Sequence, residues 1–218
     1  MHGRVKSRAT AETPSRDVRF SAVDVETTGL DPLGNRIIEI AVVRLDASGK
    51  ETDVWSSLVN PQCEVSAVEI HGICGRDVRC APVFPAIAET VAELLENTVL
   101  VAHNARFDRS FLNAEFARAG TDYRIRPENT VCTMDQSKIY CEPGPHSLSG
   151  LCSRLGFGQT GAHRALNDAR MCAKLLRYYL RREELNLRCC ERALSRQGTE
   201  IFPESWTGAV PWKMRPAR

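Results

Sequence analysis

The stretch FSAVDVETTGL at residues 20–30 begins as an apolar strand and then places two carboxylates, Asp24 and Glu26, two residues apart. Side chains on a strand alternate between its two faces, so these two acids point the same way. Like charges at that spacing repel each other, and burial makes each charge more costly. A DxE pair by itself is usually a solvated strand end, so the remaining acids must decide whether it is a site.

Two later stretches also place an acid beside apolar helix positions. In VAHNARFDRSFL, Asp108 lies next to Phe107 in a predicted helix, although Asp is a poor helix-interior residue. In AHRALNDARMCAKLL, Asp168 lies near the apolar side of a second predicted helix. Buried charges are seldom left unpaired, so both acids need partners if they are buried. His163 can face the same site as Asp168 if the helix begins between them, and is otherwise an ordinary loop histidine.

Each of these acids has an ordinary explanation as a solvated side chain, but a single explanation covers all four. If they converge, their four negative charges match the four positive charges of two divalent cations. Hard carboxylate oxygens suit Mg²⁺ or Mn²⁺ better than zinc. We therefore expect a carboxylate site that holds metal.

The elements that must position these acids follow from the hydrophobic periodicity. Strands are predicted at 18–25, 37–45, 53–59, 98–102 and 130–134. Helices are predicted within 81–97, after Asn104 as an N-terminal cap, at 147–156 and at 165–180. The first three strands have short connections, which favours an antiparallel meander. The later alternation of helices and strands predicts a mixed α/β sheet with helices on its faces. Ligands of such sheets bind near the carboxyl ends of the strands, where Asp24 and Glu26 lie.

The totals set broad limits on the protein. A chain of 218 residues that is 43% hydrophobic suits one domain with tails. Its 29 basic and 27 acidic residues nearly balance, so net charge does not by itself indicate nucleic acid. Nine cysteines without a CxxC pair indicate free thiols in a reducing compartment. A zinc site at Cys74 and Cys80 is an alternative, but their spacing matches no common zinc pattern.

The location of the protein and the limits of its domain are inferred from its apolar runs and from its terminal segments. No apolar run approaches the ~20 residues that span a bilayer. The first 17 residues lack the apolar region of a secretory signal. We therefore expect a cytoplasmic protein with a disordered basic arm at 1–17, a domain at 18–182 and a C-terminal extension at 183–218.

The motifs DVETTGL, HNARFD and HRALNDA together resemble those of the DEDDh family of 3′–5′ exonucleases. This family includes the proofreading epsilon subunit of bacterial DNA polymerase III and stand-alone relatives. NRIIEIAVVRL, EIHGI and HSLSGLCSRLG extend the similarity, which covers roughly residues 18–180. The resemblance implies the ribonuclease H-like fold. That fold is a mixed five-stranded sheet, with an antiparallel three-strand meander plus two parallel strands and helices on both faces.

The resemblance also implies roles for individual residues. Two divalent cations, Mg²⁺ or Mn²⁺, would be held by the acids Asp24, Glu26, Asp108 and Asp168. His163, at the spacing H-x4-D, would be the general base. The terminal nucleotide would be contacted by Thr27, Thr28, Gly29, Leu30, His71, Asn104 and Phe107. Cys74 stands where relatives often have threonine.

The implied activity is metal-dependent hydrolysis of DNA from the 3′ end, which releases nucleoside 5′-monophosphates in proofreading or repair. One alternative is an RNA-trimming 3′–5′ exoribonuclease, because no residue reads the 2′-hydroxyl. Another is a module that binds nucleic acid or a polymerase without cutting. Expected partners are nucleic acid and a DNA polymerase subunit or sliding clamp, with Trp206 and Trp212 as anchors, and no membrane.

Overall fold

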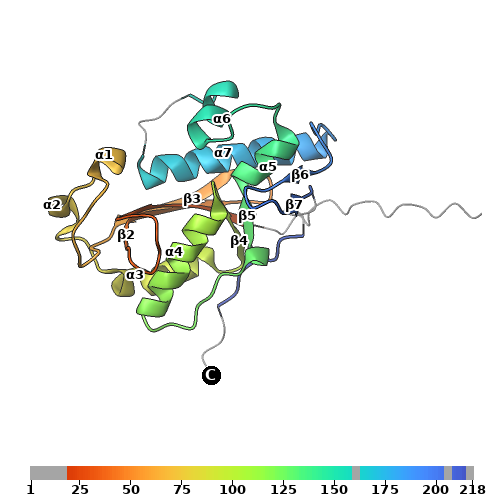
Figure 1. Cartoon of the computed structure of the whole chain (residues 1–218). Coiled ribbons are helices and arrows are strands. Elements are labelled where there is room, and N and C mark those ends of the chain that lie inside the picture. Colours follow the sequence, from red (N-terminus) through yellow and green to blue (C-terminus); the bar gives the residue numbers. More distant parts are fainter. Residues whose placement is uncertain (1–18, 159–162, 204–207, 215–218) are drawn as a thin grey trace, which may run out of the picture.

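A computed structural model describes residues 19–158, 163–203 and 208–214 (Figure 1). Its centre is a five-stranded sheet with the order β3-β2-β1-β4-β5. The strands are β1 (Arg19–Thr27), β2 (Ile37–Leu45), β3 (Glu51–Leu58), β4 (Thr98–Ala102) and β5 (Thr130–Cys132). All five predicted strands are present, and the bounds of β2 and β4 are those expected from the sequence.

Strand direction confirms the mixed sheet. β1, β2 and β3 pair antiparallel as a meander, whereas β4 is parallel to β1 and β5 is parallel to β4. The carboxyl ends of β1, β4 and β5 therefore meet at one edge of the sheet, where ligands of such folds bind. In the register of β1 on β2, Glu26 lies opposite Glu39.

Helices cover both faces of the sheet, as expected for the ribonuclease H-like fold. Figure 1 shows α5 (Thr133–Tyr140), α6 (Leu148–Arg154) and α7 (Ala165–Glu184) above it, with α3 (Phe84–Leu95) and α4 (Ala105–Arg118) below. Alternate β1 residues supply the two cores: Phe20 and Ala22 face α7, whereas Val23 and Val25 face α3 and α4. Two short helices, α1 (Val68–His71) and α2 (Gly75–Val78), lie at the left of the figure.

Three local predictions need correction. The strand predicted at 130–134 ends at Cys132, because Thr133 starts helix α5, whose residue Tyr140 stacks on Tyr179 of α7 with ring centroids 5.3 Å apart. α7 runs to Glu184 rather than ending at Leu180, which is buried within it. Asn104 occupies the position before α4, but its φ of 79° is left-handed and its side chain makes no capping bond.

The described part of the C-terminal extension folds onto the domain. A hairpin of β6 (Ala193–Leu194) and β7 (Glu200–Ile201) lies against α5. Further on, the Trp212 backbone bonds with Thr98 and Asn97 at 2.8 Å each. The Trp212 ring is 3% exposed. The expectation that Trp212 anchors a partner is therefore wrong, because this side chain is used in the domain's own core; Trp206 and the predicted arm at 1–17 lie outside the described residues.

Two further expectations concern the cysteines and the membrane. All nine cysteines are free thiols, and three of them are exposed: Cys63, Cys80 and Cys189. Among the described residues, no cysteine joins a group with metal-ligand spacing, so the zinc alternative finds no support there. None of the helices in the described ranges combines the length and hydrophobicity needed to cross a bilayer.

Candidate active site

Three carboxylates that are far apart in the sequence meet at the carboxyl end of β1. Asp24 and Glu26 share one face of β1, and Asp168 lies in the first turn of α7. One oxygen from each side chain lies within 4.8 Å of the other two. The predicted convergence is therefore present for these three acids.

Asp108 reaches the same region from the first turns of α4 and is 3% exposed. Burial raises its pKa to about 8, and the backbone amides of Asp108 and Val25 act in the opposite direction. Burial also raises the pKa of Asp24 well above its usual range, and the next largest cause is the charge of Asp108. Asp108 therefore lies close enough to Asp24 for their charges to repel, although it is outside the group of three acids whose oxygens meet within 4.8 Å.

Glu26 and Asp168, which are half-buried, also have raised pKa values. Burial, then Asp168 and Glu39, raise the pKa of Glu26 to about 7, while Arg164 opposes the shift. Burial raises the pKa of Asp168, and His163 opposes it. The cationic side chains among the described residues therefore leave the cluster under-compensated. An all-oxygen donor set with surplus negative charge fits a hard divalent cation.

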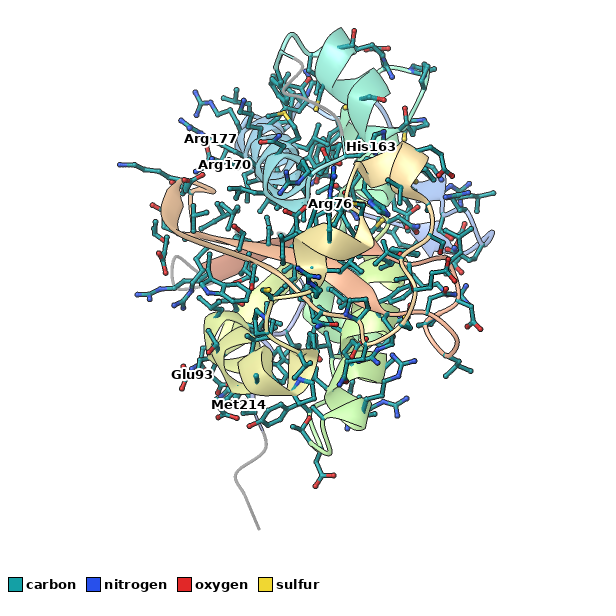
Figure 2. All side chains as sticks on the ribbon, turned by 90° about the vertical axis from the view of Figure 1, so that its left-hand side faces the viewer. Arg76, Glu93, His163, Arg170, Arg177 and Met214 are labelled. Atoms are coloured by element: carbon teal, nitrogen blue, oxygen red, sulfur yellow. The ribbon has the colours of Figure 1, made fainter. Side chains whose placement is uncertain are left out.

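His163 lies beside this cluster at the start of α7. It is exposed, its φ is +60°, and α7 begins two residues later at Ala165. Since the helix begins between His163 and Asp168, both can face one site, as the sequence predicted. Figure 2 shows His163 on the side of the molecule where Arg76 of α2 also lies.

Glu39 is a fifth acid at the site, and the sequence reasoning missed it. It is 5% exposed on β2 and accepts hydrogen bonds from Arg164 Nη2 at 2.6 Å and from the Ala165 backbone N–H at 2.9 Å. Glu39 therefore caps α7 and fixes the residue that follows His163. The available signal was a single acid inside the otherwise apolar strand IIEIAVV, since such an acid needs a buried partner.

A second buried ion pair holds α4, the helix that carries Asp108. Glu115 is fully buried and accepts two bonds from Arg36, at 2.7 and 3.0 Å, and one from the Ile37 backbone N–H at 3.3 Å. Bidentate pairs of this kind add geometric specificity as well as energy. They tie α4 to the start of β2, so Asp108 and Glu39 are positioned by the same strand.

The loop after Glu26 contains four of the predicted nucleotide contacts. The hydroxyl of Thr27 donates to the Gly29 carbonyl at 2.7 Å, and that of Thr28 accepts from the Arg36 N–H at 3.0 Å. A Cβ at Gly29 would lie 2.4 Å from Asn35 Oδ1, so a larger residue here would displace the Asn35 side chain. Leu30 is 84% exposed. The threonines and the glycine shape the loop, and Leu30 is its exposed apolar side chain.

The other three predicted contacts differ in their surroundings. His71 is buried; its Nε2 lies 3.1 Å from the Ser66 carbonyl, and its Nδ1 accepts from the Ile73 N–H at 3.0 Å. Because Ser66 also donates to the Thr28 carbonyl, His71 supports the loop after Glu26. Phe107 is partly buried against Phe111, with ring centroids 4.8 Å apart. Asn104 lines a neighbouring cavity rather than capping α4.

Comparison with known proteins agrees with this geometry. The sequence profile of the exonuclease family (RNase T) matches residues 21–176. The chain is 32% identical over 165 residues to the DNA polymerase III subunit epsilon of Rickettsia conorii, covering 72% of each protein. It is 35% identical over 159 residues to the PolC-type DNA polymerase III of Thermotoga petrophila, covering 72% of this chain but 11% of that polymerase.

A solved structure of exonuclease X in complex with 5′-overhanging duplex DNA is 29% identical and has a TM-score of 0.58. The superposition covers 77% of this chain and 93% of that one. Residues 21–176, which the family profile matches, include most of β1, all of α4 and most of α7, and these elements carry all four acids. The chain therefore belongs to the exonuclease family, as an epsilon-like member of its DEDD group.

Proposed function

We propose that this protein is a metal-dependent 3′–5′ exonuclease that cuts DNA one nucleotide at a time and releases nucleoside 5′-monophosphates. The observation that supports this most is the meeting of Asp24, Glu26 and Asp168 within 4.8 Å, with the charge of Asp108 raising the pKa of Asp24. A structural role does not account for so many under-compensated carboxylates at one strand end, whereas catalysis on a phosphodiester does.

The four acids would hold two divalent cations, Mg²⁺ or Mn²⁺. Cations bound there supply a water of lowered pKa and offset negative charge on the reacting phosphate. The residues of the chain perform the remaining tasks. His163, exposed beside Asp168, accepts the proton of the attacking water as general base. Glu39 and Arg164 keep the start of α7 in the position that this proton transfer requires.

We assign recognition of the 3′-terminal nucleotide to apolar side chains around the carboxylate cluster. Leu30 and Ile70 are large apolar side chains that are mostly exposed there, and Phe107 precedes Asp108 on α4. Aromatic side chains stack on bases with little regard to sequence, and aliphatic side chains make nonspecific contacts with them. The site would therefore accept any terminal base, as a general exonuclease must.

A role in proofreading or repair is part of the proposal, because relatives of this chain are named as subunits of DNA polymerase III. Association with a polymerase subunit or a sliding clamp follows from the same argument. Co-purification of the full-length chain with a replicative polymerase tests it. A chain that remains free of polymerase and clamp under mild conditions would count against this role, while leaving the nuclease proposal intact.

The activity is tested with a 5′-labelled oligonucleotide, with Mg²⁺ or with a chelator. We expect a ladder of products shortened from the 3′ end, and loss of that ladder in Asp24→Asn. Matched single-stranded DNA, mispaired duplex DNA and RNA in the same assay separate the DNA enzyme from the RNA-trimming alternative. Intact binding without any ladder in all three would refute the proposal in favour of a non-cutting module.

A further inference from the structure

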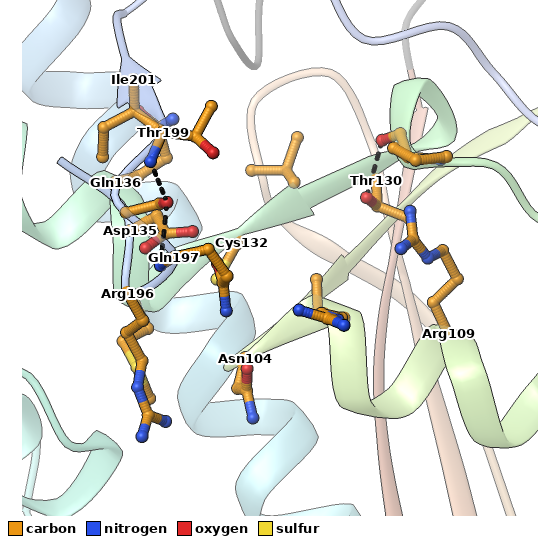
Figure 3. Close-up of a pocket in the computed structure, with 16 residues that line it drawn as sticks. Asn104, Arg109, Thr130, Cys132, Asp135, Gln136, Arg196, Gln197, Thr199 and Ile201 are labelled. Atoms are coloured by element: carbon orange, nitrogen blue, oxygen red, sulfur yellow. Dashed lines mark hydrogen bonds between the residues drawn. The ribbon is translucent and has the colours of Figure 1, made fainter. Parts of the chain in front are cut away.

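A cavity of about 290 Å³ lies along the edge strand β5, and none of the four acids lines it (Figure 3). Pockets for small ligands begin at roughly 300 Å³. Its walls come from the start of α4, from β5, from the start of α5 and from the tip of the β6–β7 hairpin. The hairpin lies outside residues 21–176, the part that matches the exonuclease family.

Three arginines line this cavity: Arg106 and Arg109 from α4, and Arg196 from the hairpin tip. Within the described residues, none of their guanidinium groups has an ion pair or a hydrogen bond. Burial and the nearby charge of Arg106 lower the pKa of Arg109, while Glu128 opposes the shift. The acid in the lining, Asp135, lies 3.7 Å from Lys138, its ion-pair partner. Like charges gathered at a cavity without partners indicate an anionic ligand.

Gln136 adds an independent observation. It is 3% exposed and lines the same cavity, and its Oε1 has no hydrogen-bond partner among the described residues. A buried polar atom without a partner costs about 1–3 kcal/mol. This oxygen is itself closed to solvent, so a ligand in the cavity would reach it only after the Gln136 side chain turned outward. The guanidinium groups therefore carry the argument, and they suit the phosphate of a nucleotide.

The position of the cavity relative to the acids indicates where this nucleotide comes from. Arg106 and Arg109 are three residues apart on α4 and share one side of that helix, while Asp108 lies on another side. One helix thus carries a carboxylate to the cluster and two guanidinium groups to the cavity. Asn104, at the start of the same helix, also lines the cavity.

The hairpin is well fixed for such a role. The Ser195 hydroxyl accepts from the backbone N–H groups of Gln197 and Thr199, at 3.2 and 3.0 Å, which defines the tip that carries Arg196. Lys138 of α5 donates to the Leu194 carbonyl at 2.5 Å. The backbone at Arg196 is therefore fixed by contacts independent of any ligand, and its side chain is exposed.

We propose that this cavity is a second nucleic-acid subsite, which takes a phosphate and its nucleotide from the substrate strand away from the 3′ end. The inference rests on the proposed function, since the strand is placed by its 3′ end at the acids. The extension of this chain then contributes directly to substrate binding, through Arg196. A strand too short to reach from the acids to the cavity gains nothing from it.

The test compares a single strand of about a dozen nucleotides with a dinucleotide, using Arg196→Gln and Arg109→Gln. Arg177→Gln is the matched control, because this exposed arginine lies on α7 beside Gly49, outside the cavity (Figure 2). We expect the ratio of kcat/KM on the long strand to that on the dinucleotide to fall about tenfold in the cavity variants and to stay at the wild-type ratio in the control.

Strand binding without cleavage is measured by fluorescence anisotropy in Asp24→Asn. Each lost phosphate contact lowers the slope of log Kobs against log[salt] by ~0.7 for a single strand. A slope and strand affinity equal to those of the Arg177→Gln control would overturn the proposal. It would also be overturned if a free mononucleotide bound the cavity while strand affinity stayed unchanged. Failure of the proposed function appears separately, as strand binding through these arginines without cleavage of any substrate.

Discussion

Replacing Asp108 by asparagine is expected to stabilise the metal-free protein while abolishing cleavage. Burial raises the pKa of Asp108 from 3.8 to about 8, so the folded state holds this proton more tightly than the unfolded state. Its ionisation therefore costs nothing below pH 3.8 and progressively destabilises the fold as the pH rises toward 8. Between pH 3.8 and pH 7 this difference in proton binding lowers the unfolding free energy of the wild type by ~4 kcal/mol. Because Asp24 shares the interaction, we expect Asp108→Asn to raise the unfolding free energy by ~2–4 kcal/mol.

The assay is urea unfolding of Asp108→Asn and wild type in a chelator, at several pH values from 5 to 8. The stability difference should grow with pH, and Mg²⁺ should reduce it, since a cation at 100 times its Kd stabilises the wild type by ~2.7 kcal/mol. Asp122→Asn makes the same change at an exposed position and should show no such trend. A variant that is less stable than wild type at pH 7, or whose difference does not vary with pH, refutes the reasoning.

Three further outcomes are expected. Glu39→Gln should lower kcat by ~10–100-fold with a smaller change in KM, because it loosens the start of α7. The same change should cost ~1–3 kcal/mol of unfolding free energy. As a control, Glu51→Gln breaks the exposed pair with Arg170 and should change the unfolding free energy by less than ~0.5 kcal/mol. His163→Ala should slow single-turnover cleavage by ~10²–10⁴-fold without loss of folded structure, and near-normal turnover would exclude it as the base. Trp212→Ala should cost ~3–5 kcal/mol in urea unfolding, since its ring packs against Phe116 and Tyr123 in the core; a value below ~1 kcal/mol would show that the extension is dispensable.

The sequence by itself determined the strand set and the identities of the acids. Period-two and period-3.6 patterns depend on neighbouring residues, so β2 and β4 were predicted with their observed bounds. Asp24 and Glu26 share a face because alternation along a strand is a local property. Helix α5 was missed because its sequence, TMDQSKIY, is short and mostly polar. Its helical form depends on packing against α7.

Tertiary structure alone decided which distant groups meet. Glu39 and Arg164 are 125 positions apart, Arg36 and Glu115 are 79 apart, and no local pattern pairs them. The same holds for Trp212, which a linear view places in a tail and the fold places against Thr98. The arginine-lined cavity likewise combines α4 with a hairpin some 90 residues later in the chain. Periodicity reports the faces of an element, whereas burial, charge pairing and cavities arise only when elements pack together.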